Sequence, residues 1–492
     1  MKNFRIWILL LLFNVPDALK AQTVEWSNQQ KVKSRSNYTL ILGSNPAGYF
    51  LLRSKDNEFT RELILERYKS NLALDISKEL WQPPGSIIEK VMLQHTGLIA
   101  FGLTRNNVQD KYDFLYWRAD DQLATAGTAQ TLFQVDASAI KDKHAFYIKQ
   151  SIDKSKYYIM YLMKAKDGEA SILAVQAFTN ELAPLFSKYY PLNYPVEDVF
   201  ITGFECDDSD NAFVLIDFPD SPVKKRGESQ RKFFLYAISA TQNDLTEFEL
   251  GNDSTEIVDL GLVVNNYHQS VTVSGFYRDK TTENSLDGIF MCSIDIRTLS
   301  YRVRRSYPFD KSLVHKSTSV LTNENSPGLS DLLIRKIIPR SDGGCMVIAE
   351  KSYETKQVYT YFVNGFQQTS SRTVYNYDEV MVFSLDTEGK MQFNDVIKKR
   401  QSSVNDGGYY SSFVTLNTNS SVALIYSMDA SAESDIMIST ISPKGEIDTR
   451  ILIKAMSYYV SLMPPESRQI SANSTLICAM KDRKFSIMKV TY

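Results

Sequence analysis

The chain has 492 residues, of which 43% are hydrophobic and 12% aromatic, so it can bury a large core and is not a disordered protein. Its 55 basic and 57 acidic residues nearly cancel, which excludes the basic footprint of a nucleic-acid-binding protein. Four cysteines in so long a chain exclude a disulfide scaffold. Each cysteine falls in a different repeat of the pattern described below, so we expect free, buried thiols at Cys206, Cys292, Cys345 and Cys478.

The first 21 residues have the three-part layout of a secretory signal peptide. Lys2 and Arg5 form a basic start, residues 6–13 form an apolar stretch, and a more polar stretch ends at Ala21, after which we expect cleavage. The apolar stretch is too short to span a bilayer, and no cysteine lies near the cleavage site to carry a lipid anchor. We therefore expect a secreted or periplasmic protein without a membrane span. The alternative is a buried N-terminal helix, which would need polar residues on one face.

Strand-like runs with two-residue alternation recur along the whole chain, whereas helical spacing is hardly ever sustained. In "MVFSLDTEGKMQFNDVI" (residues 381–397), Phe383 and Leu385 point to the same side of one strand, and a second alternating strand follows a short turn. Gly389 can supply the positive φ that such a turn requires. The stretch therefore predicts a β-hairpin.

Looser versions of this hairpin recur at intervals of roughly 50 to 60 residues, within the range of a repeated supersecondary unit. In chain order they begin at Ile64, Tyr112, Ser171, Phe233, Ile289 and Ile436. Two further strand-like runs precede each hairpin, so the predicted unit is four antiparallel strands, called a to d, with the hairpin as c and d.

A four-stranded sheet with two apolar faces cannot bury both faces alone, but sheets arranged radially around an axis can. The sequence therefore predicts an all-β fold in which residues 22–492 form a single β-propeller. The last run, which begins at Ser474, supplies strands b and c only, and the segment around Glu25 and Trp26 can supply the missing strand d. This pairing would close the ring and leave no open sheet edge. Counting the repeats gives eight four-stranded blades, or seven if the weak unit at Tyr112 is not a blade.

In this strand pattern nearly the whole chain resembles secreted β-propeller proteins. The resemblance concerns the fold only, because the sequence lacks the GH...WD pair of WD40 blades, the Asp box of sialidases and the tryptophan docking motif of quinoprotein dehydrogenases. Double glycines occur in "DGGCMV" and "DGGYYS" as in kelch blades, but without the Tyr and Trp of the kelch pattern. The resemblance thus implies an architecture and no activity.

No catalytic, cofactor-binding or metal-binding motif stands out, so we expect none of these sites. Phosphate-binding loops, dinucleotide fingerprints and the G-x-S-x-G nucleophile elbow are absent from the sequence. No two histidines have metal-ligand spacing among His95, His144, His268 and His315. The S-x-x-K pattern occurs by chance in a chain rich in both residues, at Ser138, Ser151, Ser221 and Ser229.

The acidic cluster "ECDDSDNA" includes Glu205, Asp207, Asp208, Asp210 and Asn211. Its carboxylate and amide oxygens could bind calcium, although the central glycine and the distal glutamate of an EF-hand loop are missing. Asp, Ser and Asn are also the residues that a turn between strands a and b prefers. We favour the turn.

Long connections point to a binding face, because binding tends to reside on elaborated loops carried by a rigid scaffold. Four of them connect b to c or d to a, which places them on the same face of blades four to six; they comprise the segments beginning at Asp217, Arg278 and Pro308 and residues 352–377. The first contains a basic run, Lys224, Lys225 and Arg226, which is either solvated charge or part of a contact surface.

In the last connection, Asn364-Gly365 between alternating runs is a strong hairpin signal. It predicts a β-hairpin that projects beyond the blade. The candidate contact residues are Tyr359, Tyr361, Phe366 and Tyr375. Alternatively, these aromatic side chains fold down and cover an exposed blade edge.

These observations favour a non-enzymatic recognition or assembly module that binds a protein or a glycan. The alternative is a carbohydrate-active hydrolase of propeller fold, with carboxylates near the central channel. Two or three carboxylates and an arginine converging at the channel mouth would favour the hydrolase.

Overall fold

The computed structural model describes residues 22–32, 38–56, 58–59, 62–125, 127–140, 146–165, 170–219, 231–251, 255–279, 285–317, 329–364 and 366–492. The expected signal peptide lies outside these ranges, as does the basic run from Lys224 to Arg226. His144, Ser221 and Ser229 also lie outside them. Within the described residues, no helix has the length and apolar character needed to cross a lipid bilayer.

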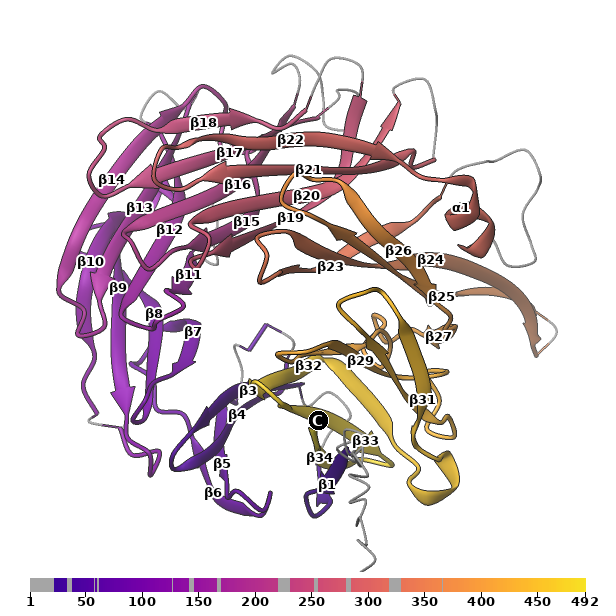
Figure 1. Cartoon of the computed structure of the whole chain (residues 1–492). Coiled ribbons are helices and arrows are strands. Elements are labelled where there is room, and N and C mark those ends of the chain that lie inside the picture. Colours follow the sequence, from indigo (N-terminus) through magenta and orange to yellow (C-terminus); the bar gives the residue numbers. More distant parts are fainter. Residues whose placement is uncertain are drawn as a thin grey trace, which may run out of the picture.

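The described residues form eight antiparallel sheets, numbered 1 to 8 in the chain order of their inner strands, from β3 to β32 (Figure 1). Sheet 1 consists of β3 (Tyr38–Asn45), β4 (Gly48–Ser54), β5 (Ile64–Tyr68) and β6 (Leu74–Glu79). Sheet 2 consists of β7 (Ile87–Leu93), β8 (Leu98–Asn106), β9 (Lys111–Ala119) and β10 (Gln130–Asp136). Sheet 3 consists of β11 (Tyr147–Gln150), β12 (Lys156–Lys164), β13 (Ser171–Thr179) and β14 (Pro184–Leu192). Sheet 4 consists of β15 (Phe200–Cys206), β16 (Asn211–Pro219), β17 (Arg231–Ser239) and β18 (Thr246–Glu249).

The second half of the chain follows the same scheme with additions in two sheets. Sheet 5 consists of β19 (Thr255–Asn265), β20 (Ser270–Asp279), β21 (Gly288–Asp295) and β22 (Ser300–Pro308). Sheet 6 consists of β23 (Leu332–Pro339), β24 (Cys345–Val363), β25 (Phe366–Leu385), β26 (Met391–Ile397) and β27 (Gln401–Val404). Sheet 7 consists of β28 (Val414–Asn417), β29 (Val422–Ser427), β30 (Ile436–Ile441) and β31 (Ile447–Ile453). Sheet 8 consists of β32 (Ser461–Ser471), β33 (Ser474–Lys481), β34 (Lys484–Thr491), β1 (Thr23–Trp26) and β2 (Gln30–Lys31). One α-helix, α1 (Lys311–Ser317), and the 3-10 turns η1 (Ala137–Ala139) and η2 (Ala455–Ser457) lie in connections.

Eight four-stranded antiparallel sheets are the arrangement expected of an eight-bladed β-propeller. The weak second unit forms a complete sheet, β7 to β10, so the count is eight and the alternative of seven is wrong. The first strands of neighbouring sheets contact one another and form the inner layer, as β15, β19 and β23 do. The predicted turn in sheet 6 is also present, with Gly389 at φ +72°.

The two ends of the described chain meet in sheet 8. Strand β1 pairs antiparallel with β34, from Thr23 opposite Thr491 to Trp26 opposite Met488. The ring of Trp26 also stacks on Tyr458, with 4.0 Å between the ring centroids. The predicted pairing of the first strand with the last repeat is therefore present (Figure 1).

Apolar side chains fill the space between neighbouring sheets. The central strands are buried on both faces, as the run from Val422 to Ser427 in β29 shows. Each large apolar cluster draws its residues from two successive sheets, and one cluster joins sheet 1 to sheet 8 through Ile41, Leu51, Met463 and Ile487. Such faces explain why these runs form strands and why no sheet is stable alone.

A β-bulge interrupts the inner strand in six of the eight sheets, all within the described residues. The register shifts follow Ile41, Ile88, Ile201, Ile257, Ile334 and Met463. A bulge breaks the two-residue alternation and turns the next side chain out of its regular place. The residues that follow the breaks are Gly43, Lys90, Gly203, Asp259, Lys336 and Arg468.

All four cysteines lie in the described residues and are buried, with free thiols. The expectation from their positions in separate repeats is therefore confirmed. None of them adds a covalent link between the sheets.

Candidate functional site

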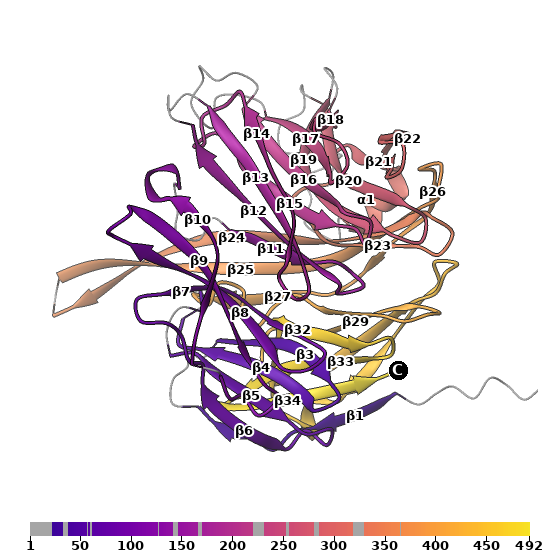
Figure 2. The ribbon, with the colours of Figure 1, turned by 90° about the vertical axis from the view of Figure 1, so that its left-hand side faces the viewer.

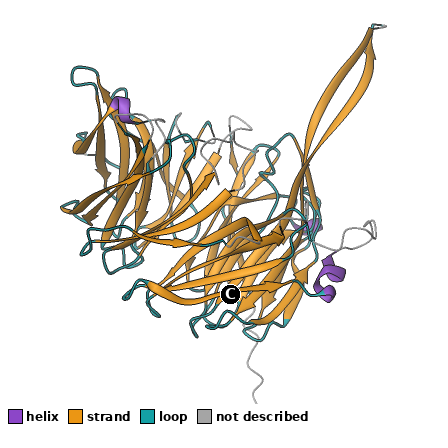
Figure 3. Cartoon of the chain, turned by 90° about the horizontal axis from the view of Figure 1, so that it is seen from above, coloured by secondary structure: helices purple, strands orange, loops and turns teal. Residues whose placement is uncertain are grey.

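Strands β24 and β25 continue far beyond sheet 6. Strand β23 accompanies β24 only as far as Lys351, and β27 accompanies β25 only over residues 374–377. Residues 356–363 and 366–373 pair with each other alone, and we call this part the ribbon. Its eight residue pairs give it a length of roughly 25 Å. Figures 2 and 3 show that the ribbon leaves the body of the molecule, which confirms the predicted projecting hairpin.

One face of the ribbon is aromatic and uncovered. Side chains alternate between faces, and cross-strand partners share a face, so Tyr359, Tyr361, Val363 and Phe366 lie together. Phe366 is 75% exposed and Tyr359 49% exposed. The opposite face carries Phe362, which is 72% exposed. The alternative in which these aromatic side chains fold down over a blade edge is therefore wrong.

The predicted contact residues do not all lie together. Tyr359 and Tyr361 are neighbours, with 6.0 Å between their ring centroids. Tyr375 lies at the base of the hairpin, opposite Glu354 and Ser403, where it is only half exposed. Phe362, which the sequence analysis did not select, is among the most exposed aromatic residues of the ribbon. It belongs to the same alternating run, so the pattern could have identified it.

A fully buried carboxylate holds the root of the hairpin. Glu350 is the last residue of β24 before a register shift, and its side chain is 0% exposed. Its Oε1 lies 2.7 Å from Nζ of Lys399, and its Oε2 lies 2.8 Å from Nε of Arg335. The hydroxyl of Ser412 donates a further hydrogen bond to Oε2 over 2.7 Å. Glu350 thus joins the inner strand of sheet 6 to the connection that leads into sheet 7.

That connection runs from the hairpin root to sheet 8. Asn405 bonds to the ribbon, because its side-chain oxygen accepts the Thr373 N–H over 2.9 Å. Further along, the hydroxyl of Tyr409 donates to Oε1 of Glu466, which lies in the bulge of β32. The same oxygen accepts the backbone N–H of Thr39 in sheet 1 over 2.8 Å. Desolvation raises the pKa of Glu466 from 4.5 to about 8, although the Thr39 N–H and the nearby Arg53 oppose the rise.

A second carboxylate bridges inner strands in the same way. Oδ2 of Asp259, which follows the bulge in β19, accepts the N–H of Ile334 in β23 over 2.6 Å. Burial raises the pKa of Asp259, and this bond opposes the rise. Carboxylates at the bulges therefore satisfy backbone groups of the next sheet.

A pocket of about 460 Å³ lies against the inner strands of sheets 2 to 5. Glu89, Lys90, Lys149 and Glu205 line it, and Nζ of Lys149 lies 2.7 Å from Oε1 of Glu205. Two carboxylates, those of Glu89 and Glu205, thus line this inner pocket.

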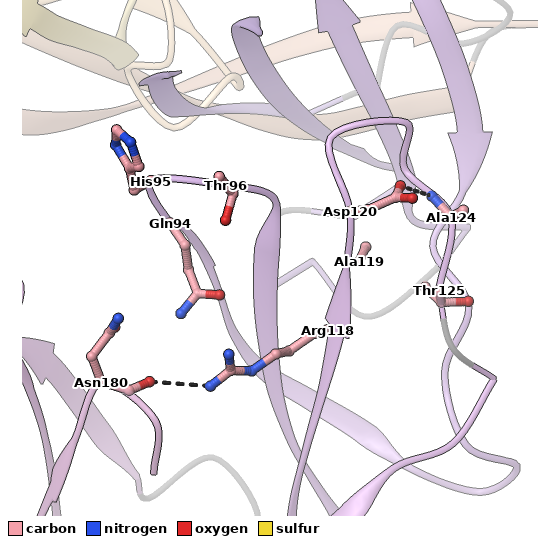
Figure 4. Close-up of a pocket in the computed structure, with 9 residues that line it drawn as sticks. All are labelled: Gln94, His95, Thr96, Arg118, Ala119, Asp120, Ala124, Thr125 and Asn180. Carbon is pink, nitrogen blue, oxygen red and sulfur yellow. Dashed lines mark hydrogen bonds between the residues drawn. The ribbon is translucent and has the colours of Figure 1, made fainter. Parts of the chain in front are cut away.

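A larger hollow of about 570 Å³ lies at the turns of sheets 2 and 3. Figure 4 shows His95 and Asp120 at opposite ends of this hollow. The Asp120 carboxylate caps its own turn by accepting the Ala124 N–H over 2.8 Å, and Arg118 donates to the Asn180 carbonyl over 3.1 Å. These polar groups stabilise turns, so the hollow shows no catalytic arrangement.

The acidic cluster forms a turn. Oδ1 of Asp207 accepts the N–H groups of Ser209 and Asn211, each over 2.8 Å. Nζ of Lys156 lies 2.9 Å from Asp210 Oδ1. The carboxylates are thus engaged by protein donors. Among the described residues, no three His, Cys, Asp or Glu side chains are grouped so that they could hold a metal ion.

No protein-family model matches the chain, and no curated protein matches it. Among solved structures, the WD40 domain of SCAP from fission yeast is similar over 94% of this chain and 98% of its own, with 9% identity and a TM-score of 0.39. The β-propeller domain of the Trilobed protease from Pyrococcus furiosus is similar over 88% and 96%, with 9% identity and a TM-score of 0.34. Porphyromonas gingivalis dipeptidyl peptidase 4 is similar over 90% of this chain and 58% of its own, with 11% identity and a TM-score of 0.42. The resemblance to β-propeller proteins is one of fold alone.

Replacing Glu350 by alanine should destabilise the protein strongly, because Lys399 would remain buried without its counter-ion. We expect the free energy of unfolding of Glu350→Ala to fall by about 3–5 kcal/mol in denaturant titrations. The control is Lys55→Ala, which removes an exposed ion pair with Glu62. It should cost at most about 1 kcal/mol. Equal losses in the two variants would contradict the assigned role.

Glu466 should make stability depend on pH. Its pKa is about 8 in the folded protein and near 4.5 when unfolded, so the folded state holds an extra proton between these values. The stabilisation is complete below 4.5 and is lost as pH rises through 8, by about 1.4 kcal/mol per pH unit within the window. Glu466→Gln keeps the oxygen that accepts from Thr39 and Tyr409 but cannot ionise. As the pH rises from 5 to 9, the denaturation midpoint of the wild type should therefore fall relative to that of Glu466→Gln. Parallel curves of midpoint against pH for the two proteins would refute the assignment.

Proposed function

We propose that this chain is an exported, non-enzymatic binding module that docks onto a protein partner through the ribbon. The observation that carries the proposal is the uncovered aromatic face around Tyr361 on an element that projects away from the body. Isolated two-stranded hairpins are marginal in water, so covering this face by a partner would stabilise it. The export part rests on the layout of residues 1–21, and the expected mature N-terminus in mass spectrometry is Gln22.

The ribbon suits a protein surface better than a glycan. The exposed side chains of Val358, Phe362 and Val363 offer apolar contact without hydrogen-bonding groups. Glycan sites are usually concave and lined with placed polar groups. Residues 356–373 contain Lys356 and Arg372 and no acidic residue, which favours a partner surface that is apolar with acidic neighbours.

The scaffold of this proposal is one domain, residues 22–492, in which the sheets close into a ring. The pairing of β1 with β34, the apolar cluster between sheets 1 and 8, and the Glu466–Thr39 bond support closure. A closed ring has no terminal sheet from which unfolding can begin. The wild-type protein should therefore melt in one cooperative transition.

The second candidate is a carbohydrate-active hydrolase, and it is supported by the presence of Glu89 and Glu205 in one inner pocket. Glycosidases use two carboxylates on either side of the scissile bond. The ion pair between Glu205 and Lys149 opposes this role. We expect no turnover of a panel of aryl glycosides; activity that Glu89→Gln abolishes would establish the hydrolase instead.

Removing the ribbon should abolish partner binding and leave the scaffold intact. Lys356 and Thr373 are cross-strand partners, so replacing residues 357–372 by Asn-Gly joins the two shortened strands with a two-residue turn. The melting temperature should change little, since the variant keeps Thr373, which bonds to Asn405, and the strands it removes pair only with each other. A collapse of folding would show that the ribbon serves the core.

Photo-crosslinking in the producing cells tests which surface is engaged. A benzoylphenylalanine placed at Tyr361 should give one discrete crosslinked product. The control is Tyr267, a more exposed tyrosine, at 86% against 41% for Tyr361, in the turn between β19 and β20. Identical products from both sites, or none from Tyr361, would exclude docking through the ribbon.

A further inference from the structure

Three exposed basic residues lie just after the register shifts of inner strands. Lys90 in β7, Lys336 in β23 and Arg468 in β32 each directly follow a register shift. Within the described part of the chain, no carboxylate lies within ion-pair distance of any of the three; Arg468 donates a long hydrogen bond, 3.4 Å, to the carbonyl of Ile41.

The surroundings of these three cations disfavour their charged forms. Their side chains are solvated, yet the surrounding protein lowers the pKa of all three. For Lys90, desolvation is the largest cause, and repulsion from Lys149 and Arg468 adds to it. Arg468 belongs to sheet 8 and Lys149 to sheet 3, so positive charges from different sheets act on the same ammonium group.

The inner pocket is a ligand-sized space beside Lys90 and Lys149. Its volume of about 460 Å³ falls within the range of small-molecule sites, roughly 300–1,000 Å³. Lys90 and Lys149 line it, and Tyr147 and Leu262 add apolar surface. Tyr147 is 41% exposed, so its ring is available for contact. Glu89 and Glu205 also line the pocket; Lys149 pairs with Glu205, and among the described residues no carboxylate lies within ion-pair distance of Lys90.

We propose that this pocket binds a small organic carboxylate. The ammonium group of Lys90 holds the carboxylate, Arg468 adds attraction from across the interior, and Tyr147 and Leu262 contact the apolar body of the ligand. The anion pairs with Lys90 and offsets the repulsion that Lys149 and Arg468 exert on it. Such a group can come from a free carboxylic acid or from the carboxyl terminus of a peptide. This site is independent of the ribbon and of its partner.

Matched acids and amides test the assignment on the full mature chain at low ionic strength. The probes are phenylacetate and phenylacetamide for the free acid, and acetyl-Ala-Phe with a free or an amidated terminus for the peptide. We expect at least one acid to raise the melting temperature and to bind in isothermal titration, while both amides do neither. Binding of the peptide acid alone assigns a chain terminus as the source, and binding of phenylacetate assigns free acids. Equal responses to acid and amide, or no response to either acid, would overturn the proposal.

Three variants locate the binding. Lys90→Gln should weaken the binding of the acid by about tenfold or more, since it removes the charged donor. Arg468→Gln should weaken it less, because its contribution is long-range. The control Lys444→Gln removes an exposed lysine from the turn between β30 and β31 and should bind as the wild type does. Without ligand, Lys90→Gln should melt no lower than the wild type, because it relieves repulsion. Wild-type affinity in Lys90→Gln, or equal weakening by Lys444→Gln, contradicts this site.

Discussion

The structure depends on the burial of two apolar faces per sheet. Strands such as β29 and β33 are buried along almost their whole length, so each sheet must be covered on both sides. Its neighbours along the chain provide that cover, and sheets 1 and 8 cover each other through a cluster that includes Ile41 and Met463. Every other feature, including the ribbon and the inner pocket, is placed by this stacking.

The bulges are the second organising feature, because they place polar and charged side chains in inner strands that otherwise pack through apolar faces. A regular inner strand would point its side chains alternately at its two neighbours. The residues left unpaired at the breaks, one in five of these strands and four in β32, change that direction, and the structure uses the change in two ways. Asp259 and Glu466 turn toward the next sheet and accept backbone N–H groups. Lys90 and Lys336, which also follow bulges, are exposed instead, and no carboxylate lies within ion-pair distance of either among the described residues.

The sequence predicted those parts of the structure that depend on local alternation. The hairpins, the four-strand unit, the pairing of Trp26 with the last repeat and the projecting ribbon all follow from it. The bulges escaped detection because they interrupt the alternation that served as the signal. An isoleucine two residues before glycine, lysine or aspartate recurs in the inner strands, as in "ILG", "IEK", "ITG", "IVD" and "IRK", and this recurrence could have identified them.

Buried charge was the part that the sequence could not reveal. Glu350, Lys399 and Ser412 come from different strands and connections, and only the fold brings them together. Periodicity distinguishes apolar from polar positions, but it does not show which charged residues lose their water. The basic run from Lys224 to Arg226 lies outside the described residues and stays a prediction.

The pairing of β1 with β34 also sets the order of events during synthesis. The first strand to leave the ribosome is the one whose partner is made last, so its hydrogen bonds must wait for nearly the entire polypeptide. Contacts of such long sequence separation slow folding. A nascent chain would therefore lack this pairing until β34 has been made.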